Sequence, residues 1–446
     1  MNRRIRALTW LAPGVGIAVL LGGAPAANAA QPPQSARPSQ PPGSVERWIA
    51  RQAVPLATAD PSAPLDDLAS LRRSVGDAAV VGLGESVHGT AEQTALKLRA
   101  LRFLVERMGF RSLAWEEDWT MGLKINEYVR TGKGDPAALV REMSPQYQNR
   151  EVADVLRWLR GYNAGRQDGD KVEFVGVEYY FTRPSAYDAI KAQVAKTAPE
   201  RLADLRKHKV VRPWTSNMLK YTTWYRETVQ DKHSYVRHAR QVYDLVKHLP
   251  DGGRDHRLAL HHARQIVSFY EHFVLEFNEA NAYRDAHAAG NLAWWRGHSG
   301  GDRIVYWAAS AHTANAPALH VTAQDGQDLR YPAAGSHLRR RYGGRYRSIG
   351  FTFDHGAALL GPGRTVALAR PAPNWFERRF GGVGAAQFVL DLRAPAPAPV
   401  RRWLSAPTVT RGLPYFGPDS ITTGGALSEW FDVIVHRQEV SPAGPA

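Results

Sequence analysis

The sequence has no cysteine and, apart from its first 30 residues, no long hydrophobic run. Without cysteine the protein cannot form disulfides, so its stability must come from a packed core. A metal site built on thiolates is excluded for the same reason. Beyond the N-terminal segment, no apolar stretch approaches the roughly 20 residues that a membrane-spanning helix needs. These absences favour a globular protein stabilised by its interior.

The N-terminal 30 residues have the three parts of a secretory signal peptide. A basic start that includes Arg3 and Arg4 precedes an apolar core at residues 10–21, and residues 27–29 (Ala-Asn-Ala) form a cleavage site. We therefore expect a secreted, extracellular protein. Removal of residues 1–30 would leave 416 residues (446 − 30).

The rest of the chain divides by composition into three parts. Residues 31–44 are rich in proline, glutamine and serine and are predicted to be a disordered leader. Residues 45–440 are predicted to form the folded domain, which is long enough to bury a sizeable core. Residues 441–446 are predicted to be a tail.

Basic residues outnumber acidic ones, 57 to 42, which gives a formal charge of +15. Loss of three arginines with the signal peptide would lower this charge to +12 (15 − 3). The densest basic run, residues 339–347, also contains aromatic residues and glycines, and no nucleic-acid-binding module is recognisable. We interpret the excess as a solvated basic face and expect neither nucleic-acid binding nor, after signal cleavage, membrane binding.

Strand-like and helix-like segments alternate in both outer thirds of the domain. Short buried runs such as residues 79–81 and 172–178 stand next to helical patterns such as residues 92–108. This alternation predicts an α/β fold, a three-layer α/β/α core with helices on both faces of a parallel-type sheet. From about residue 185 to 296 the chain is almost entirely helical in pattern and rich in aromatics. That segment is predicted to be a largely helical lobe inserted into the core.

The stretch VVGLGESVHGT, residues 80–90, places an acid and an imidazole where the first predicted strand ends. Glu85 and His88 follow two glycines at the start of a long helical pattern. A second strand, residues 110–115, ends in Glu116. If the two strands are parallel neighbours, Glu116 reaches the same sheet edge as Glu85 and His88, where α/β proteins bind ligands. Two carboxylates and a histidine at one edge predict a site for proton transfer.

Several well-known motifs do not fit this stretch. The glycine spacing of residues 84–89 is that of a P-loop, but the lysine and Ser/Thr that hold phosphate and magnesium are missing. A nucleophile elbow would need glycine where His88 stands, so Ser86 is a weak nucleophile candidate. A metal site that includes Glu85 and His88 stays open, although the sequence has no HExxH or HxxEH run. Simple capping of the helix by the same two residues also stays open.

The heptapeptide GESVHGT, residues 84–90, resembles the GE(S/T)-x-HGT signature of the erythromycin esterase family. Further short matches in the same order extend this resemblance over nearly the whole mature chain. They include Glu92, Lys97, Glu116, residues 126–129, residues 158–163, residues 172–178, Arg284, Asp285, Asn291, residues 304–308, His312, residues 343–350, residues 388–393 and residues 430–432. The resemblance implies an ester hydrolase that needs no covalent nucleophile, metal or cofactor.

The resemblance also implies roles for five side chains. His88 would be the general base that takes a proton from water, and Glu85 and Glu116 would orient His88 and that water. Lys97 stands where the family often has arginine, and it would face the oxyanion or hold Glu116 in place. His312 matches the second histidine of the family's WAHN-x-H strand end and would contact the carbonyl oxygen or the leaving group.

Three positions depart from the family pattern. Ala309 replaces the first histidine of the strand end and Ser310 replaces its asparagine, while Glu178 stands where aspartate is more usual. An alanine can neither donate nor accept a side-chain hydrogen bond. The loss of this imidazole predicts that the substrate is not erythromycin itself.

We therefore predict a secreted esterase or lactonase that hydrolyses a small-molecule ester or macrolactone with water activated by His88. If the substrate is a macrolide, the enzyme would confer antibiotic resistance. Two alternatives remain: a degenerate member that binds a ligand without hydrolysis, and a metal-dependent hydrolase using Glu85, His88, Glu116 and His312. The sequence leaves the oligomeric state open.

Overall fold

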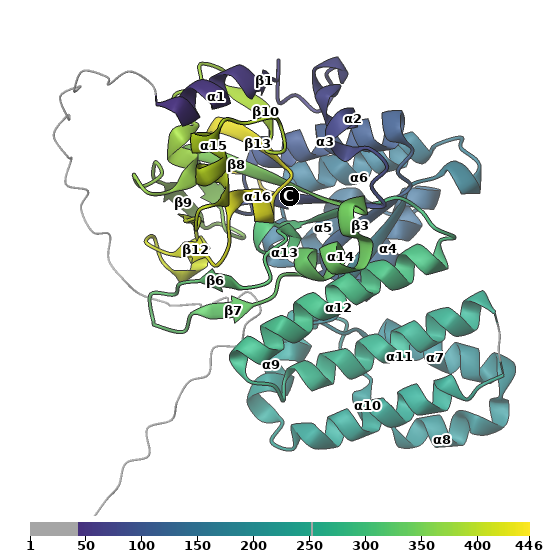
Figure 1. Cartoon of the computed structure of the whole chain (residues 1–446). Coiled ribbons are helices and arrows are strands. Elements are labelled where there is room, and N and C mark those ends of the chain that lie inside the picture. Colours follow the sequence, from purple (N-terminus) through teal and green to yellow (C-terminus); the bar gives the residue numbers. More distant parts are fainter. Residues whose placement is uncertain (1–42, 251–252) are drawn as a thin grey trace, which may run out of the picture.

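The computed structural model describes residues 43–250 and 253–446 (Figure 1). The predicted signal peptide and the predicted leader up to residue 42 lie outside the described residues. The first described helix is α1 (Ser44–Gln52). Among the described helices, none is both long and apolar enough to cross a membrane.

A mixed sheet forms the centre of the molecule, and nine of its strands fall within the described residues. Their order is β1-β10-β13-β8-β2-β5-β3-β4, with β9 paired to β8. The strands from β13 to β4 are parallel, whereas β1, β9 and β10 pair antiparallel. The bounds are β1 (Val54–Pro55), β2 (Val80–Glu85), β3 (Ser112–Asp118), β4 (Glu173–Glu178), β5 (Ile304–Ala309), β8 (Tyr346–Leu359), β9 (Thr365–Leu368), β10 (Gln387–Asp391) and β13 (Val433–Val440).

The order of the central strands could not be predicted from the sequence. Strands β2 and β3 are not neighbours, since β5 lies between them and pairs in parallel with both. Strand order depends on where the chain returns after the helical segment, which local patterns cannot reveal. Because all three strands are parallel, their carboxyl ends still share one edge, so Glu85 and Glu116 reach the same side of the sheet as expected.

Helices cover both faces of the sheet, which confirms the predicted three-layer fold. Successive strand residues point to opposite faces. Thus Val81 and Val305 pack under α3 and α6, while Val80 and Ile304 pack under α12 and α14. The helices of the first face are α2 (Ser70–Val75), α3 (Ala91–Met108), α4 (Trp119–Thr131), α5 (Pro136–Glu142) and α6 (Arg150–Asn163), and those of the second include α12 (Phe277–His298), α13 (Ser310–Thr313) and α14 (Ala334–Tyr342).

The predicted helical lobe is present and has a core of its own. Aromatic and aliphatic side chains such as Tyr225, Val242 and Phe269 form this core. The lobe comprises α7 (Pro184–Thr197), α8 (Leu202–Lys207), α9 (Met218–Thr228), α10 (Lys232–Lys247) and α11 (Arg254–His272). The next helix, α12, follows the lobe in the chain and also packs on the central sheet.

A small antiparallel sheet was not predicted. Its order is β11-β12-β6-β7, and each strand has only two or three residues, too few for a hydrophobic alternation to be recognised. The strands are β6 (Leu319–Val321), β7 (Leu329–Tyr331), β11 (Thr410–Arg411) and β12 (Ile421–Thr423). Two further helices, α15 (Ala398–Ser405) and α16 (Leu427–Trp430), lie in the same half of the chain.

Residues 441–446, predicted to be a tail, are packed against the domain. The backbone N–H of Ala443 donates to the carbonyl of Gly89 at 2.9 Å, and Ala443 is buried. The backbone N–H of Arg150, at the start of α6, donates to the carbonyl of Gly444 at 2.9 Å. This segment therefore connects the loop after β2 to the start of α6.

Candidate active site

His88 lies in the loop between β2 and α3, three residues after Glu85, the last residue of β2. Its Nδ1–H donates to Oε1 of Glu85 at 2.8 Å, and both side chains are buried. Because an ionised carboxylate only accepts hydrogen bonds, this contact places the ring proton on Nδ1. Nε2 is then a lone-pair acceptor, and it lies 4.0 Å from Oε2 of Glu116.

Lys97, on α3, forms an ion pair with Oε2 of Glu85. Its ammonium also donates to the carbonyl of Ala308 at 3.3 Å and lies over the ring of Trp307. Lys97 is buried and does not border the cavity that His88 lines. Lys97 thus contacts Glu85 rather than Glu116, which corrects one expected contact, and its position away from the cavity argues against contact with an oxyanion.

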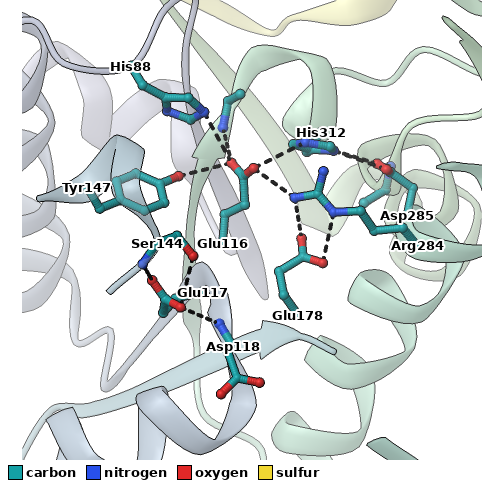
Figure 2. A network of polar contacts seen from close by, with 12 residues as sticks. His88, Glu116, Glu117, Asp118, Ser144, Tyr147, Glu178, Arg284, Asp285 and His312 are labelled. Atoms are coloured by element: carbon teal, nitrogen blue, oxygen red, sulfur yellow. Dashed lines mark hydrogen bonds and ion pairs between the residues drawn. The ribbon is translucent and has the colours of Figure 1, made fainter. Parts of the chain in front are cut away.

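Glu116, at the end of β3, is the centre of the polar network in Figure 2. Its Oε2 accepts from the hydroxyl of Tyr147 at 3.0 Å and from the backbone N–H of Ala309 at 2.9 Å. Its Oε1 accepts from Nη2 of Arg284 at 2.8 Å and lies 3.3 Å from Nε2 of His312. Burial raises the pKa of Glu116, but the charge and hydrogen bond of His312 and the charge of Arg284 outweigh burial and hold it well below the usual value. Glu116 is therefore ionised at neutral pH.

His312, on α13 just after β5, is paired with a second carboxylate. Its Nδ1 lies 3.0 Å from each oxygen of Asp285, which comes from α12. The backbone N–H of Ala334 also donates to Asp285 at 2.7 Å and fixes that carboxylate. Burial lowers the pKa of His312, but Asp285 and Glu116 outweigh it and raise the pKa to about 10. His312 is thus a cation at neutral pH.

Arg284 joins Glu116 to Glu178 at the edge of the sheet (Figure 2). Its Nε and Nη2 donate to the two oxygens of Glu178, each at 3.0 Å. Its guanidinium lies over the ring of Tyr180, 4.7 Å from the centroid. Nη1 has no acceptor among the described residues, and the side chain borders the cavity. The Nη1 hydrogens of this fixed cation are therefore left for a ligand.

The electrostatics of the two histidines differ. Burial lowers the pKa of His88 below its usual value, and the nearby charge of Glu116 opposes this only in part. His88 is therefore neutral at pH 7, as a general base requires. His312, held between Asp285 and Glu116, is protonated at the same pH. The site combines a neutral imidazole and a cationic one on either side of one carboxylate.

His88, Glu116, Arg284, Ala309 and His312 border a cavity of about 710 Å³. Pockets of roughly 300–1,000 Å³ are typical of small-molecule sites. The cavity walls come from the small sheet, β9 and the start of α12, and they are mostly apolar. They include Phe277, Leu329, Tyr331, Val366, Leu368, Trp375, Leu413, Tyr415 and Phe416.

Four of the five predicted site residues, Glu85, His88, Glu116 and His312, form one connected network, and Lys97 touches it through Glu85. Sequence reasoning gave no role to the other members. Arg284 and Asp285 belong to the family resemblance without an assigned function, and Glu178 enters the sequence analysis only as a departure from the family's usual aspartate. Tyr147 carried no signal at all, because it lies in a short turn, Pro145–Tyr147.

The donor atoms do not suit the metal-dependent alternative. Nδ1 of His88 is bonded to Glu85, and the two nitrogens of the cationic His312 lie beside Asp285 and Glu116. Both oxygens of Glu116 already accept from protein donors. Across residues 43–250 and 253–446, no group of three His, Asp or Glu side chains could hold a metal ion. The four residues of that alternative instead form a hydrogen-bonded and ion-paired chain.

Comparison with known proteins shows the family and the fold of the chain. Erythromycin esterase type II from Escherichia coli is 32% identical over 133 residues, which cover 30% of this chain and only 31% of that relative. A crystal structure of a Bacillus cereus protein has a TM-score of 0.77 at 27% identity and covers 90% of this chain and 98% of that one. A mutant of the erythromycin esterase EreC in its open conformation has a TM-score of 0.67 at 18% identity, covers 86% of this chain and 97% of that one, and shares the fold. The Erythromycin esterase family profile matches residues 105–440, and the chain belongs to that family.

Proposed function

We propose that this protein hydrolyses a carboxylic ester or lactone with a water molecule activated by His88. The observation that carries the proposal is the position of Nε2 of His88. His88 lines the cavity, Glu85 holds its Nδ1, and its Nε2 lies 4.0 Å from Oε2 of Glu116 and accepts no hydrogen bond from the described residues. A water bound in the cavity beside His88 would donate one hydrogen bond to Nε2. As it attacks the carbonyl carbon, its proton passes to His88.

The developing oxyanion needs positive charge or hydrogen-bond donors. Two cations border the same cavity, the protonated His312 and Arg284, whose Nη1 has no acceptor within the described part of the chain. Both are fixed by carboxylates before substrate binds, so they need no reorganisation in the transition state. Loss of one such donor typically costs about 10²–10³ in turnover. When the tetrahedral intermediate collapses, His88 returns its proton to the leaving alkoxide, which departs as the alcohol.

The role that we propose for Glu85 is to set the tautomer and orientation of His88. Lys97, buried behind Glu85, would keep that carboxylate ionised and in place. Tyr147 supports the arrangement from the other side. Its ring packs edge-on against His88, with the ring centroids 5.1 Å apart, and its hydroxyl donates a hydrogen bond to Glu116. We further propose that the enzyme is exported, as the N-terminal sequence predicts.

The competing proposal is a family member that binds a ligand without hydrolysis. Ala309 favours it, because this residue brings a methyl group to the cavity where the family has an imidazole. The intact His88, Glu116 and His312 network favours the enzyme. We therefore place hydrolysis first.

The test is a screen of p-nitrophenyl esters, simple lactones and macrolides with the wild-type protein and His88→Gln. Hydrolysis should fall by at least about 10²-fold in His88→Gln, since the general base is lost, and the thermal midpoint should stay close to wild type. His233→Gln, which changes an exposed histidine on α10, is the matched control. If no ester is hydrolysed while ligands still raise the thermal midpoint, the binding proposal replaces the enzyme.

A further inference from the structure

The cavity bordered by His88 carries more positive than negative charge. Two arginines, Arg364 and Arg411, line the part formed by β9 and the loop after β11. Apart from Glu116, which is already bonded to Arg284 and His312, the only acidic lining residue among those described is Asp325. An uncompensated charge in a cavity selects ligands of opposite charge.

Arg411 is held rigidly at this wall. Its Nη2 donates to the carbonyl of Ala369 at 2.6 Å and to that of Asp354 at 3.2 Å. Its guanidinium lies over the rings of Phe353 and Trp375, at 4.6 and 5.1 Å from their centroids. These contacts fix the side chain without neutralising it, because carbonyls and rings carry no net charge.

The carboxylates behind Arg411 compensate its charge only in part. Within the described residues no carboxylate lies within ion-pair distance of Arg411, and the side chain of Asp354 is paired with Arg370 and His355. Burial raises the pKa of Glu377 to about 7. Glu377 is therefore only partly ionised at neutral pH. A net positive charge remains at this wall.

Arg364 and Tyr415 add a second cation and a donor. The guanidinium of Arg364 has no acceptor or ion-pair partner among residues 43–250 and 253–446, and it is exposed at the rim. The hydroxyl of Tyr415 is buried, and it is the single buried side-chain polar atom of the lining residues without a hydrogen-bond partner in that described part. Burial raises the pKa of Tyr415 to about 12, and the charge of Arg364 opposes this rise. The phenol is thus a neutral donor close to Arg364.

We propose that the substrate carries an anionic group, such as a carboxylate, away from its scissile bond, and that Arg364 and Arg411 select it. The inference rests on the proposed ester hydrolysis and names the substrate class. Tyr415 would donate to the same group. An ester with an ammonium group would be repelled, and an aminosugar macrolide is such an ester.

Matched esters that differ only in terminal charge test this proposal. The p-nitrophenyl esters of hexanoate, adipate and 6-aminohexanoate have the same chain length with a neutral, an anionic and a cationic end. At low ionic strength kcat/KM should be about tenfold higher for adipate than for hexanoate, and lower again for the amine. The preference should shrink as salt screens the charges.

Three variants test whether Arg364 and Arg411 cause the preference for the anionic ester. Arg364→Gln changes an exposed side chain and should lower kcat/KM for adipate, relative to that for hexanoate, by about threefold to tenfold. Arg411→Met should do the same, and its thermal midpoint reports whether the wall has folded. Arg402→Gln removes the same charge from an exposed position on α15 outside the cavity and should change neither ester.

The outcomes separate the two proposals. Hydrolysis of all three esters at equal kcat/KM, or a preference that Arg364→Gln and a folded Arg411→Met both leave intact, overturns the anionic substrate class while the esterase stands. Hydrolysis of none of them by wild type, together with none in the wider screen, overturns the proposed function. In that case calorimetry still tests the charge preference by comparing the binding of adipic acid monoamide, which is anionic, with that of hexanamide, which is neutral. Equal affinities overturn the preference.

Discussion

Glu85 and Ala309 are register partners on the adjacent parallel strands β2 and β5, and each precedes a histidine by three residues. In the first case the strand supplies an acid to its histidine, His88. In the second the strand supplies only a methyl group and a backbone N–H, which bonds Glu116. His312 takes its acid from α12 instead, through Asp285. The two histidines thus face Glu116 from equivalent strand ends with different support.

We expect Ala309→His to raise turnover of a simple ester or macrolide by at least about tenfold, or roughly 1.4 kcal/mol of transition-state stabilisation. The new imidazole would reach the cavity from a position that already borders it. Its nitrogen could donate to the oxyanion or the leaving group. The measurement is kcat on the best ester of the screen, with the thermal midpoint as a check on folding.

Ala309→Phe is the matched control, because it adds a ring of similar size without a hydrogen-bonding atom. It should not raise turnover. If Phe and His give the same change, the gain comes from packing rather than from a donor. If Ala309→His gains nothing in an active enzyme, Arg284 and His312 already satisfy the transition state.

The opposite pKa shifts of the two histidines predict a broad pH optimum. His88 must be neutral to accept a proton, and burial lowers its pKa, so activity should rise along an acidic limb below about pH 6.5. His312 must be protonated to act as a cation, and its pKa is raised to about 10, so activity should fall only near that pH. The measurement is kcat against pH with a methyl ester on a pH-stat, corrected for uncatalysed hydrolysis. A single limb near pH 6.5 with no alkaline limb would contradict the cationic role of His312.

Asp285→Asn should move the alkaline limb and leave the acidic one in place. The carboxylate of Asp285 is a main cause of the raised pKa of His312, and its loss should lower that pKa by at least about one unit. An amide can still accept from the N–H of Ala334, so the fold should hold. The same pH-stat series measures both limbs. An unchanged alkaline limb would show that another group controls it.

Sequence reasoning found the edge of the sheet and the residues on it, because strand ends and short motifs are local signals. Glu85, His88 and Glu116 could be placed together from strand–turn–helix patterns alone. The position of β5 between β2 and β3 could not, because it depends on pairing across the helical lobe. Arg284 and Asp285 reach the site from the long helix α12. In a sequence, a charged pair within a helical pattern usually indicates a solvent-exposed face.

The packing of residues 441–446, which the sequence predicts to be a tail, could not be predicted for a related reason. Their proline, alanine and glycine residues form no hydrophobic pattern that indicates packing. Yet the side chain of Glu92, at the start of α3, accepts both the backbone N–H and the hydroxyl of Ser441 at 2.7 Å. A short segment held by backbone hydrogen bonds leaves no periodic signal in the sequence.

This segment, residues 441–446, contacts the loop that carries the proposed base and the start of α6. Ala443 donates to Gly89, the residue after His88, and Gly444 bonds the start of α6, which follows the turn that carries Tyr147. Gly89 has φ of 74°, and a Cβ there would lie 1.9 Å from the carbonyl oxygen of Leu359. The loop that carries His88 is therefore set by backbone contacts on both sides.

We expect Ala443→Pro to lower kcat by about tenfold with little change in KM, because proline has no N–H for the carbonyl of Gly89 and the His88 loop would lose that contact. Ala446→Pro changes an exposed residue of the same segment and should leave kcat unchanged. Deletion of residues 441–446 should lower kcat further, and the thermal midpoint separates loss of position from loss of fold. A deletion variant that stays folded and keeps wild-type kcat would show that the segment does not position His88.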